Sequence, residues 1–201
     1  TDSPIEHDEA VIFAVLHRRY ANPAKEAKHA PAGYDFNSVE GIAEFERDNA
    51  ADDSEWVVFP LFMYDHSGTA YRASEGGNPF SCKWDSGRVG IIALKRADVG
   101  VPGTVIERAG QEPYTIGSYL EQANVICDAY TDWANGNIWG YVVEDETGEH
   151  GDSCWGFICD SDDKYLMEEA RAAFQSAIAE ANTKNARSLE ESRPDLYQPG
   201  A

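Results

Sequence analysis

Residues 56–64 have the sequence WVVFPLFMY and predict the central strand of a β-sheet. β-Branched and aromatic side chains dominate this segment, as is typical of strands. Pro60 has no backbone N–H to donate to a neighbouring strand, so it predicts a sheet edge or a bulge at this point. The turn-forming residues 65–68 (DHSG) follow directly, and residues 69–73 predict a short second strand. Together these segments predict a β-hairpin.

Further strands are expected on both sides of this hairpin. Apolar runs of strand length occupy residues 10–20, 89–95, 138–144 and 155–159. Strands that pair mostly as hairpins indicate an antiparallel sheet. The predicted fold class is therefore α+β, with an antiparallel sheet of about five strands packed by a central helix and with an Ala-rich C-terminal helix.

Three other segments place apolar residues at helical spacing. The first follows the N-cap candidates Asn37 and Ser38, and it is expected to turn Val39, Ile42 and Phe45 inward. The second is the central helix, predicted between a cap at Thr115 and a C-cap at Gly136. The third is the Ala-rich helix, predicted from Tyr165 to about Glu191.

The 201 residues fit one domain with elaborations. Residues 1–163 are predicted to form the α+β core with its acidic N-terminal helix, and residues 164–201 a C-terminal helix and frayed tail packed on the same domain. No segment approaches the ~18 consecutive apolar residues of a membrane span, and the first residues are acidic where a signal peptide would be basic. We therefore expect a cytoplasmic protein without membrane contact, in the host cytoplasm if a phage encodes it, with its cysteines reduced.

The charge of the chain excludes some partners and favours others. There are 36 acidic and 16 basic residues, which gives a formal net charge of −20. Phosphate backbones would be repelled, so direct binding to nucleic acid is not expected. The same field would attract a protein whose basic groove handles nucleic acid. The alternatives are that acidity keeps the protein soluble or reflects a salt-adapted source.

Two acidic segments could bind such a partner. Glu40, Glu44 and Asp48 fall at i, i+4 spacing on one outer helix face, where like charges oppose helix formation. The second segment runs from Glu144 to Glu169. The predicted partner-binding residues are Glu40, Glu44, Asp48, Asp52, Asp53, Asp160, Asp162 and Asp163. A merely solvated acidic face is the alternative.

Short turns also hold the residue types of a hydrolase site. The candidate catalytic residues are His66, Cys82, Asp85 and Cys154. In such a site a thiolate attacks the substrate, an imidazole favours the thiolate, and a carboxylate orients the imidazole. Zinc binding by His66, Cys82, Cys154 and Cys159 is a second hypothesis, but the spacing meets a zinc knuckle only loosely. A third is structural, with buried cysteines and with Trp rings that fill the core.

No metal or cofactor is predicted for this chain. It has no phosphate-binding loop, dinucleotide fingerprint or other established enzyme motif. Enzyme chemistry is therefore the alternative hypothesis, and binding of a partner is the leading one.

Four segments carry a resemblance to a known family. They are residues 17–20 (HRRY), 59–68 (FPLFMYDHSG), 79–87 (PFSCKWDSG) with Gly90, and 152–157 (DSCWGF). In this order they resemble a family of mostly uncharacterised proteins carried by bacteriophages and integrative mobile elements. The resemblance spans residues 11–158 and implies a mobile-element setting, not a reaction. The chain departs from the family in its acidic N-terminal helix, in Cys127 and Cys159, and in its Ala-rich C-terminal helix.

The charge and the resemblance together give the leading hypothesis. Small proteins of mobile elements often counter host defence, so we expect an anti-CRISPR or antirestriction inhibitor that binds a basic nucleic-acid-handling protein, with DNA mimicry as one mode. The alternative is a Cys/His/Asp-dependent hydrolase or nuclease-like enzyme acting from the central loops. A homodimer formed through the C-terminal helix is a further hypothesis.

Overall fold

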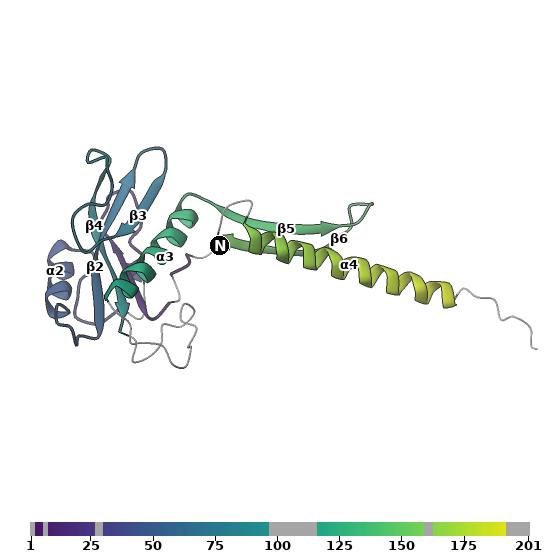
Figure 1. The fold of residues 1–201 in the computed structure, drawn as a ribbon, viewed down its shortest axis with the longest axis horizontal. Helices are drawn as coiled ribbons and strands as arrows, with labels where there is room; N and C mark the ends of the chain where they lie inside the picture. Colours follow the sequence, from purple (N-terminus) through teal and green to yellow (C-terminus); the bar gives the residue numbers. More distant parts are fainter. Residues whose placement is uncertain (1–2, 6–7, 27–29, 97–115, 159–162, 192–201) are drawn as a thin grey trace, which may run out of the picture. The chain divides into compact units, whose positions relative to one another are not determined.

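A computed structural model describes residues 3–5, 8–26, 30–96, 116–158 and 163–191 of the chain. The chain divides into two compact units, Thr1–Gly136 and Asn137–Ala201. The first holds a four-stranded antiparallel sheet with helices, and the second a two-stranded sheet with one long helix (Figure 1). The predicted α+β class is therefore confirmed. The predicted packing of residues 164–201 on a core of residues 1–163 stays a prediction.

The sheet of the first unit has the strand order β1-β4-β2-β3. Its strands are β1 (Val11–Val15), β2 (Trp56–Asp65), β3 (Thr69–Ala73) and β4 (Ser86–Lys95). All neighbours pair antiparallel, and β2 is central, as predicted. The register between β2 and β4 shifts between Leu61 and Phe62, directly after Pro60. A register irregularity thus lies next to Pro60, one of the two alternatives that its missing N–H predicted. Pro60 itself faces the β3 side, where its carbonyl accepts a hydrogen bond from the Ser74 N–H just beyond the last β2–β3 pair, Leu61 with Ala73.

Both faces of this sheet are buried. Alternate residues of β1 point to opposite sides, with Phe13 in one apolar cluster and Ile12 in the other. Helix α3 (Ile116–Ala134) contributes Tyr130 to the first cluster, where its ring contacts that of Phe13 at a centroid distance of 4.5 Å. Helix α2 (Val39–Asp48) contributes Phe45 to the second. Burial on both faces explains why β1 and most of β2 read as apolar runs and do not alternate with polar residues.

Helix α2 begins as the sequence predicts. Ser38 has extended backbone geometry, and its Oγ accepts a hydrogen bond from the backbone N–H of Gly41 at 3.0 Å. Ile42 and Phe45 are buried, but the prediction that Val39 also faces inward is wrong, because its side chain is 68 % exposed. The buried face is centred between Gly41, Ile42 and Phe45, and Val39 lies to one side of it.

Helix α3 runs along the outer edge of β3 and hydrogen-bonds to its backbone. Side-chain oxygens of three α3-side residues accept bonds from alternate backbone N–H groups of the strand. These bonds are Thr69 N to Asn135 Oδ1 at 2.9 Å, Tyr71 N to Thr131 Oγ1 at 2.9 Å, and Ala73 N to Asn124 Oδ1 at 3.0 Å. Two amide groups also donate back, Asn135 Nδ2 to the carbonyl of Thr69 and Asn124 Nδ2 to that of Ala73. The outward N–H groups of the edge strand are thereby satisfied.

The second unit consists of strands β5 (Ile138–Glu144) and β6 (His150–Ile158) and helix α4 (Lys164–Glu191). The turn between the strands is held by Asp145, whose Oδ1 accepts hydrogen bonds from the N–H groups of Thr147 at 2.8 Å and Glu149 at 2.9 Å. Helix α4 packs on both strands. The short helix α1 (Pro23–Glu26) belongs to the first unit, where it contacts β1. None of the helices described has the length and apolar character needed to cross a bilayer.

Candidate functional site

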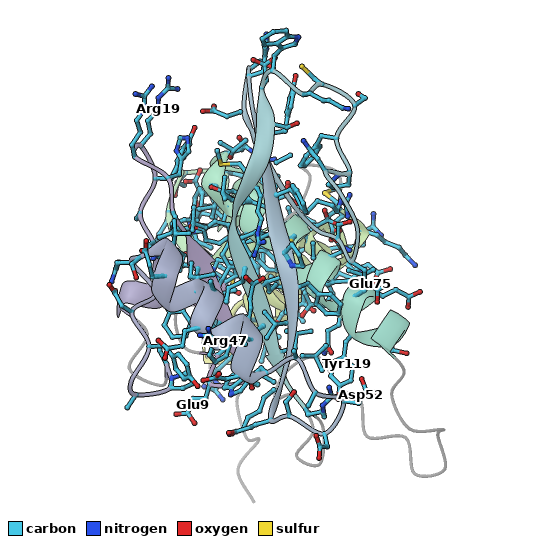
Figure 2. The ribbon with its side chains drawn as sticks, turned by 90° about the vertical axis from the view of Figure 1, so that its left-hand side faces the viewer. Glu9, Arg19, Arg47, Asp52, Glu75 and Tyr119 are labelled. Atoms are coloured by element: carbon cyan, nitrogen blue, oxygen red, sulfur yellow. The ribbon has the colours of Figure 1, made fainter. Side chains whose placement is uncertain are left out.

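Three of the motif segments meet at one end of the four-stranded sheet, with Asp65 between them. The Asp65 carboxylate accepts hydrogen bonds from Arg19 Nη1 at 3.3 Å and from the Tyr20 hydroxyl at 3.0 Å. Its backbone N–H donates to the carbonyl of Asp85 at 2.8 Å. Residues 17–20, 64–68 and 79–87 are therefore joined, and we call them the motif end. Figure 2 shows Arg19 at one end of the first unit, away from Arg47 and Asp52.

The N-terminal segment of residues 10–20, which leads to the motif end, leaves the sheet earlier than predicted. Pairing of β1 with β4 stops at Val15, so the prediction of a strand through Tyr20 is wrong. Asn22 Oδ1 accepts a hydrogen bond from the Val15 N–H at 3.0 Å, and the His17 ring stacks on that of Tyr20 at 5.0 Å. The chain therefore turns at 17–20 and reaches Asp65. Desolvation and the bond to Asp65 raise the pKa of Tyr20, which keeps its hydroxyl a donor.

Hydrogen bonds from its own side chains hold the loop between β3 and β4 in its conformation. Asn78 Nδ2 donates to Ser86 Oγ at 2.8 Å, and Ser86 Oγ donates in turn to the carbonyl of Cys82. The Cys82 thiol donates to Asp85 Oδ2 at 3.2 Å. Trp84 lies within this tied segment and is 97 % exposed. The loop thus holds a large apolar side chain out in solvent.

The structure places the four predicted catalytic residues in different surroundings. Cys82 and Asp85 are in contact through the thiol. His66 is exposed, and its ring stacks on that of Tyr64 with a centroid distance of 6.3 Å and an interplanar angle of 12°. In the part of the chain that the structure describes, no hydrogen bond joins His66 to Cys82 or Asp85. Cys154 is exposed on β6, in the other unit.

This arrangement gives Cys82 an anionic neighbour. Reactive cysteines lie beside cations such as Lys, Arg or protonated His, which favour the thiolate. At the motif end, the guanidinium of Arg19 pairs with Asp65. The geometry therefore positions a thiol and a carboxylate together without the imidazole that would activate a nucleophile.

The structural and zinc hypotheses can be tested against the surroundings of the cysteines and tryptophans. The prediction of buried cysteines is wrong for the two motif segments, because Cys82 is half-buried and Cys154 is exposed. Cys127, which lies outside those segments, is fully buried among the apolar residues of the first cluster, and burial raises the pKa of its thiol to about 12. The prediction that the neighbouring Trp rings fill the core is wrong, because Trp84 is 97 % and Trp155 is 66 % exposed. The described residues include no group of three or more His, Cys, Asp or Glu side chains that could hold a metal ion. Cys159 lies outside the described residues.

The predicted acidic residues of the first unit are all exposed. They are Glu40, Glu44 and Asp48 on α2 and Asp52 and Asp53 in the following turn. Asp48 accepts a hydrogen bond from the Tyr34 hydroxyl at 3.0 Å, which raises the pKa of Tyr34. Among the residues described, no ion pair neutralises Glu40 or Glu44. We call these five residues the acidic face.

Of the predicted acidic residues of the second unit, the structure describes Asp163, and this residue has a structural role. Asp163 Oδ1 accepts hydrogen bonds from the N–H groups of Tyr165 at 2.8 Å and Leu166 at 3.1 Å, so it caps the start of α4. Its carboxylate therefore has a local structural use. Asp160 and Asp162 lie outside the described residues.

No protein-family model matches the chain, and neither the curated proteins nor the solved structures include one found to be similar to it.

Sequence reasoning missed two residues of the motif end. Asp65 was considered only as one of several carboxylates that could orient the imidazole and was left out of the predicted site, but it joins three segments. Trp84 was expected inside the core. A signal for its exposure was present, because Ser, Cys, Lys, Asp and Ser surround it and no apolar residue follows at strand or helix spacing.

Proposed function

We propose that the protein is an acidic accessory protein of a phage or mobile element that inhibits a host defence system by binding a basic, nucleic-acid-handling protein. The observation that supports this function best is the acidic face, where Glu40 and Glu44 are exposed on a well-packed helix without a counterion in the described structure. An anti-CRISPR or antirestriction role would follow from occupying the partner's nucleic-acid groove.

The acidic face is held in a fixed position by the core beneath it. Phe45 is 1 % exposed, and its ring meets those of Phe36 at 5.1 Å and Trp56 at 6.2 Å. Carboxylates at i, i+4 repeat about every 6 Å along a helix, whereas one DNA strand carries a phosphate about every 3.4 Å. The carboxylates of the helix are therefore spaced about twice as widely as the phosphates of one strand, so the helix alone has about half the linear charge density. Asp52 and Asp53 would supply further charge beyond its end.

Reversing charge on the acidic face is expected to weaken partner binding. The variant Glu40→Lys/Glu44→Lys should associate with the partner about tenfold more slowly, because steering by opposite charges raises association rates at least that much. The partner would first be captured from host lysate at low salt with the wild-type chain and identified by mass spectrometry. Association would then be measured by biolayer interferometry.

A matched control changes the same charge elsewhere. Glu75→Lys/Glu121→Lys alters two exposed glutamates of the same unit that lie outside the acidic face. This control should bind nearly as fast as the wild type. The complex should also dissociate with added salt and with added duplex DNA. A complex that resists salt, or a control as impaired as the test variant, would contradict the proposal.

The enzyme alternative has one observation in its favour, the contact between Cys82 and Asp85. Because the neighbour is a carboxylate, we expect Cys82→Ser/Cys154→Ser to retain the biological effect in full. Serine keeps a donor for Asp85, so the loop should stay folded. The measurement is the efficiency with which a plasmid enters a host that has an active defence system. Loss of protection by a folded variant would instead favour thiol catalysis.

A further inference from the structure

The second unit leaves most of its large apolar side chains in solvent. Of the ten large apolar residues that are exposed among those described, seven belong to this unit, although it contains only residues 137–201. They are Trp139, Val142, Trp155, Tyr165, Met167, Phe174 and Ile178. Leu166 is the one buried apolar side chain that its described residues contribute. The unit therefore has almost no core of its own.

Helix α4 has two apolar faces, and the hairpin covers one of them. Leu166 is buried, and Ala170, Ala173 and Ala177 are half-buried along the side that packs on β5 and β6. Phe174 and Ile178 stand on an adjacent side and remain 53 % and 46 % exposed. Met167, two turns before Phe174, continues the same exposed stripe and is 49 % exposed.

Helix α4 is also much longer than the β5–β6 hairpin on which it packs. Its 28 residues span about 42 Å, whereas the seven residues of β5 span about 23 Å. Figure 1 shows α4 running along the hairpin and continuing past it. A two-stranded hairpin is marginal alone, and helices in proteins are stabilised mainly by packing of an apolar face. The exposed stripe on α4 is thus where additional packing would stabilise the unit most.

The charge of α4 favours a second copy of this chain as the occupant of this stripe. The helix has four basic residues (Lys164, Arg171, Lys184, Arg187) and five acidic ones (Glu168, Glu169, Glu180, Glu190, Glu191), a net charge of 4 − 5 = −1. The other 173 residues therefore carry −20 + 1 = −19. Two copies of this chain would repel each other over most of their surface, but hardly at all along α4. A strongly basic partner, by contrast, would gain little from this neutral helix.

We propose that α4 is the interface of a homodimer in which two copies pair antiparallel through Met167, Phe174 and Ile178. Along the helix, Phe174 and Ile178 each lie two residues from the level of Ser176. A two-fold axis at this level, on the face that carries Phe174 and Ile178, sets Phe174 of one helix opposite Ile178 of the other, twice, and leaves Met167 toward each end of the contact. The contact is isologous, as the two-fold symmetry of most homodimers requires. Helix axes that pack in this way lie about 8–10 Å apart.

Sedimentation velocity of the full chain tests this interface. The wild type should dimerise at concentrations up to about 100 µM, the range expected of a small apolar contact. Phe174→Glu/Ile178→Glu should weaken dimerisation at least about tenfold by burying like charges against each other. Ala172→Glu/Ser176→Glu adds the same charges at the same spacing to the opposite, exposed side of α4, and should dimerise like the wild type. Circular dichroism would verify that both variants keep their helices.

Cross-linking tests the arrangement without relying on charge. Phe174→Cys protein mixed with Ile178→Cys protein should form a disulfide between position 174 of one copy and 178 of the other, identified by peptide mass spectrometry. Links that join 174 to 174 or 178 to 178 in preference would overturn the antiparallel register. A wild type that stays monomeric over the whole concentration range, or a Phe174→Glu/Ile178→Glu variant that dimerises as well as its control, would overturn the interface itself.

Discussion

Gly90→Ala should unfold the protein or prevent it from accumulating in soluble form. Gly90 lies in β4 between β1 and β2, where it pairs with Val15 and Leu61. A Cβ at this position would overlap the backbone carbonyl group of Ala14, which lies in a fully buried strand. The backbone of β1 cannot move aside as a flexible side chain can. We therefore expect a loss of about 3 kcal/mol or more in the free energy of unfolding, out of a total of about 5–15 kcal/mol.

A second glycine of the same strand is the matched control. A Cβ at Gly87 would meet no atom within 4 Å. Gly87→Ala should therefore change the free energy of unfolding by less than about 1 kcal/mol. Urea unfolding followed by circular dichroism measures both variants. If Gly90→Ala proved as stable as Gly87→Ala, the close approach of β1 and β4 at this point would be wrong.

Phe45→Ala is expected to destabilise the protein by about 3–5 kcal/mol, the usual cost of removing a fully buried phenyl ring. Its ring fills the space between α2 and the sheet, with edge contacts to Tyr34 at 5.0 Å and Phe36 at 5.1 Å. The cavity cannot close readily, because aromatic rings fixed by other contacts line it. The free energy of unfolding in urea measures the loss.

The effect of this substitution reaches the acidic face. Because Phe45 holds α2 on the sheet, its loss should also reduce binding to a basic partner in the folded fraction. Val39→Ala changes a 68 % exposed residue of the same helix, and should alter the free energy of unfolding by less than about 0.5 kcal/mol. A cost below about 1 kcal/mol for Phe45→Ala would mean that α2 is not anchored through this ring.

The sequence was sufficient where local chemistry determines the structure. The β-branched and aromatic residues around Pro60 predicted a strand, and Pro60 predicted an edge or a bulge within it, because a missing N–H has the same consequence in any sheet; the register shifts next to it. Ser38 predicted the start of α2 because its side chain bonds to a backbone group three residues away. Such signals depend on few neighbours, and all of those neighbours are close in the chain.

Features that depend on distant partners were not predictable in this way. The turn at residues 17–20 is fixed by Asp65, 45 residues beyond Tyr20. The bonds from Asn124 and Asn135 to β3 link residues that are 51 and 66 positions apart. Apolar runs predicted β5 and the last part of β6, which begins at His150 and not at Trp155, but they cannot say which sheet a strand joins. The structure puts them in a sheet of two.

In the candidate site, too, contacts within one loop could be predicted, and those between distant segments could not. Cys82 and Asp85 are three residues apart in one loop, so their contact follows from local geometry. The role of His66 could not be inferred, because an exposed turn histidine stacked on Tyr64 has the same sequence signature as one directed at a thiol. The acidic face was predictable, since spacing along a helix fixes which carboxylates share a side.

The bonds between α3 and β3 limit how other molecules can recognise the first unit. An exposed edge strand normally invites another chain to add to the sheet, either as a bound peptide or as the start of an aggregate. Here Asn124, Thr131 and Asn135 already occupy the outward N–H groups of Thr69, Tyr71 and Ala73. Strand addition at this edge would require α3 to detach first. A partner that approaches from this side must therefore be selected by side-chain chemistry, not by main-chain pairing, and the protein is protected from sheet-to-sheet aggregation there.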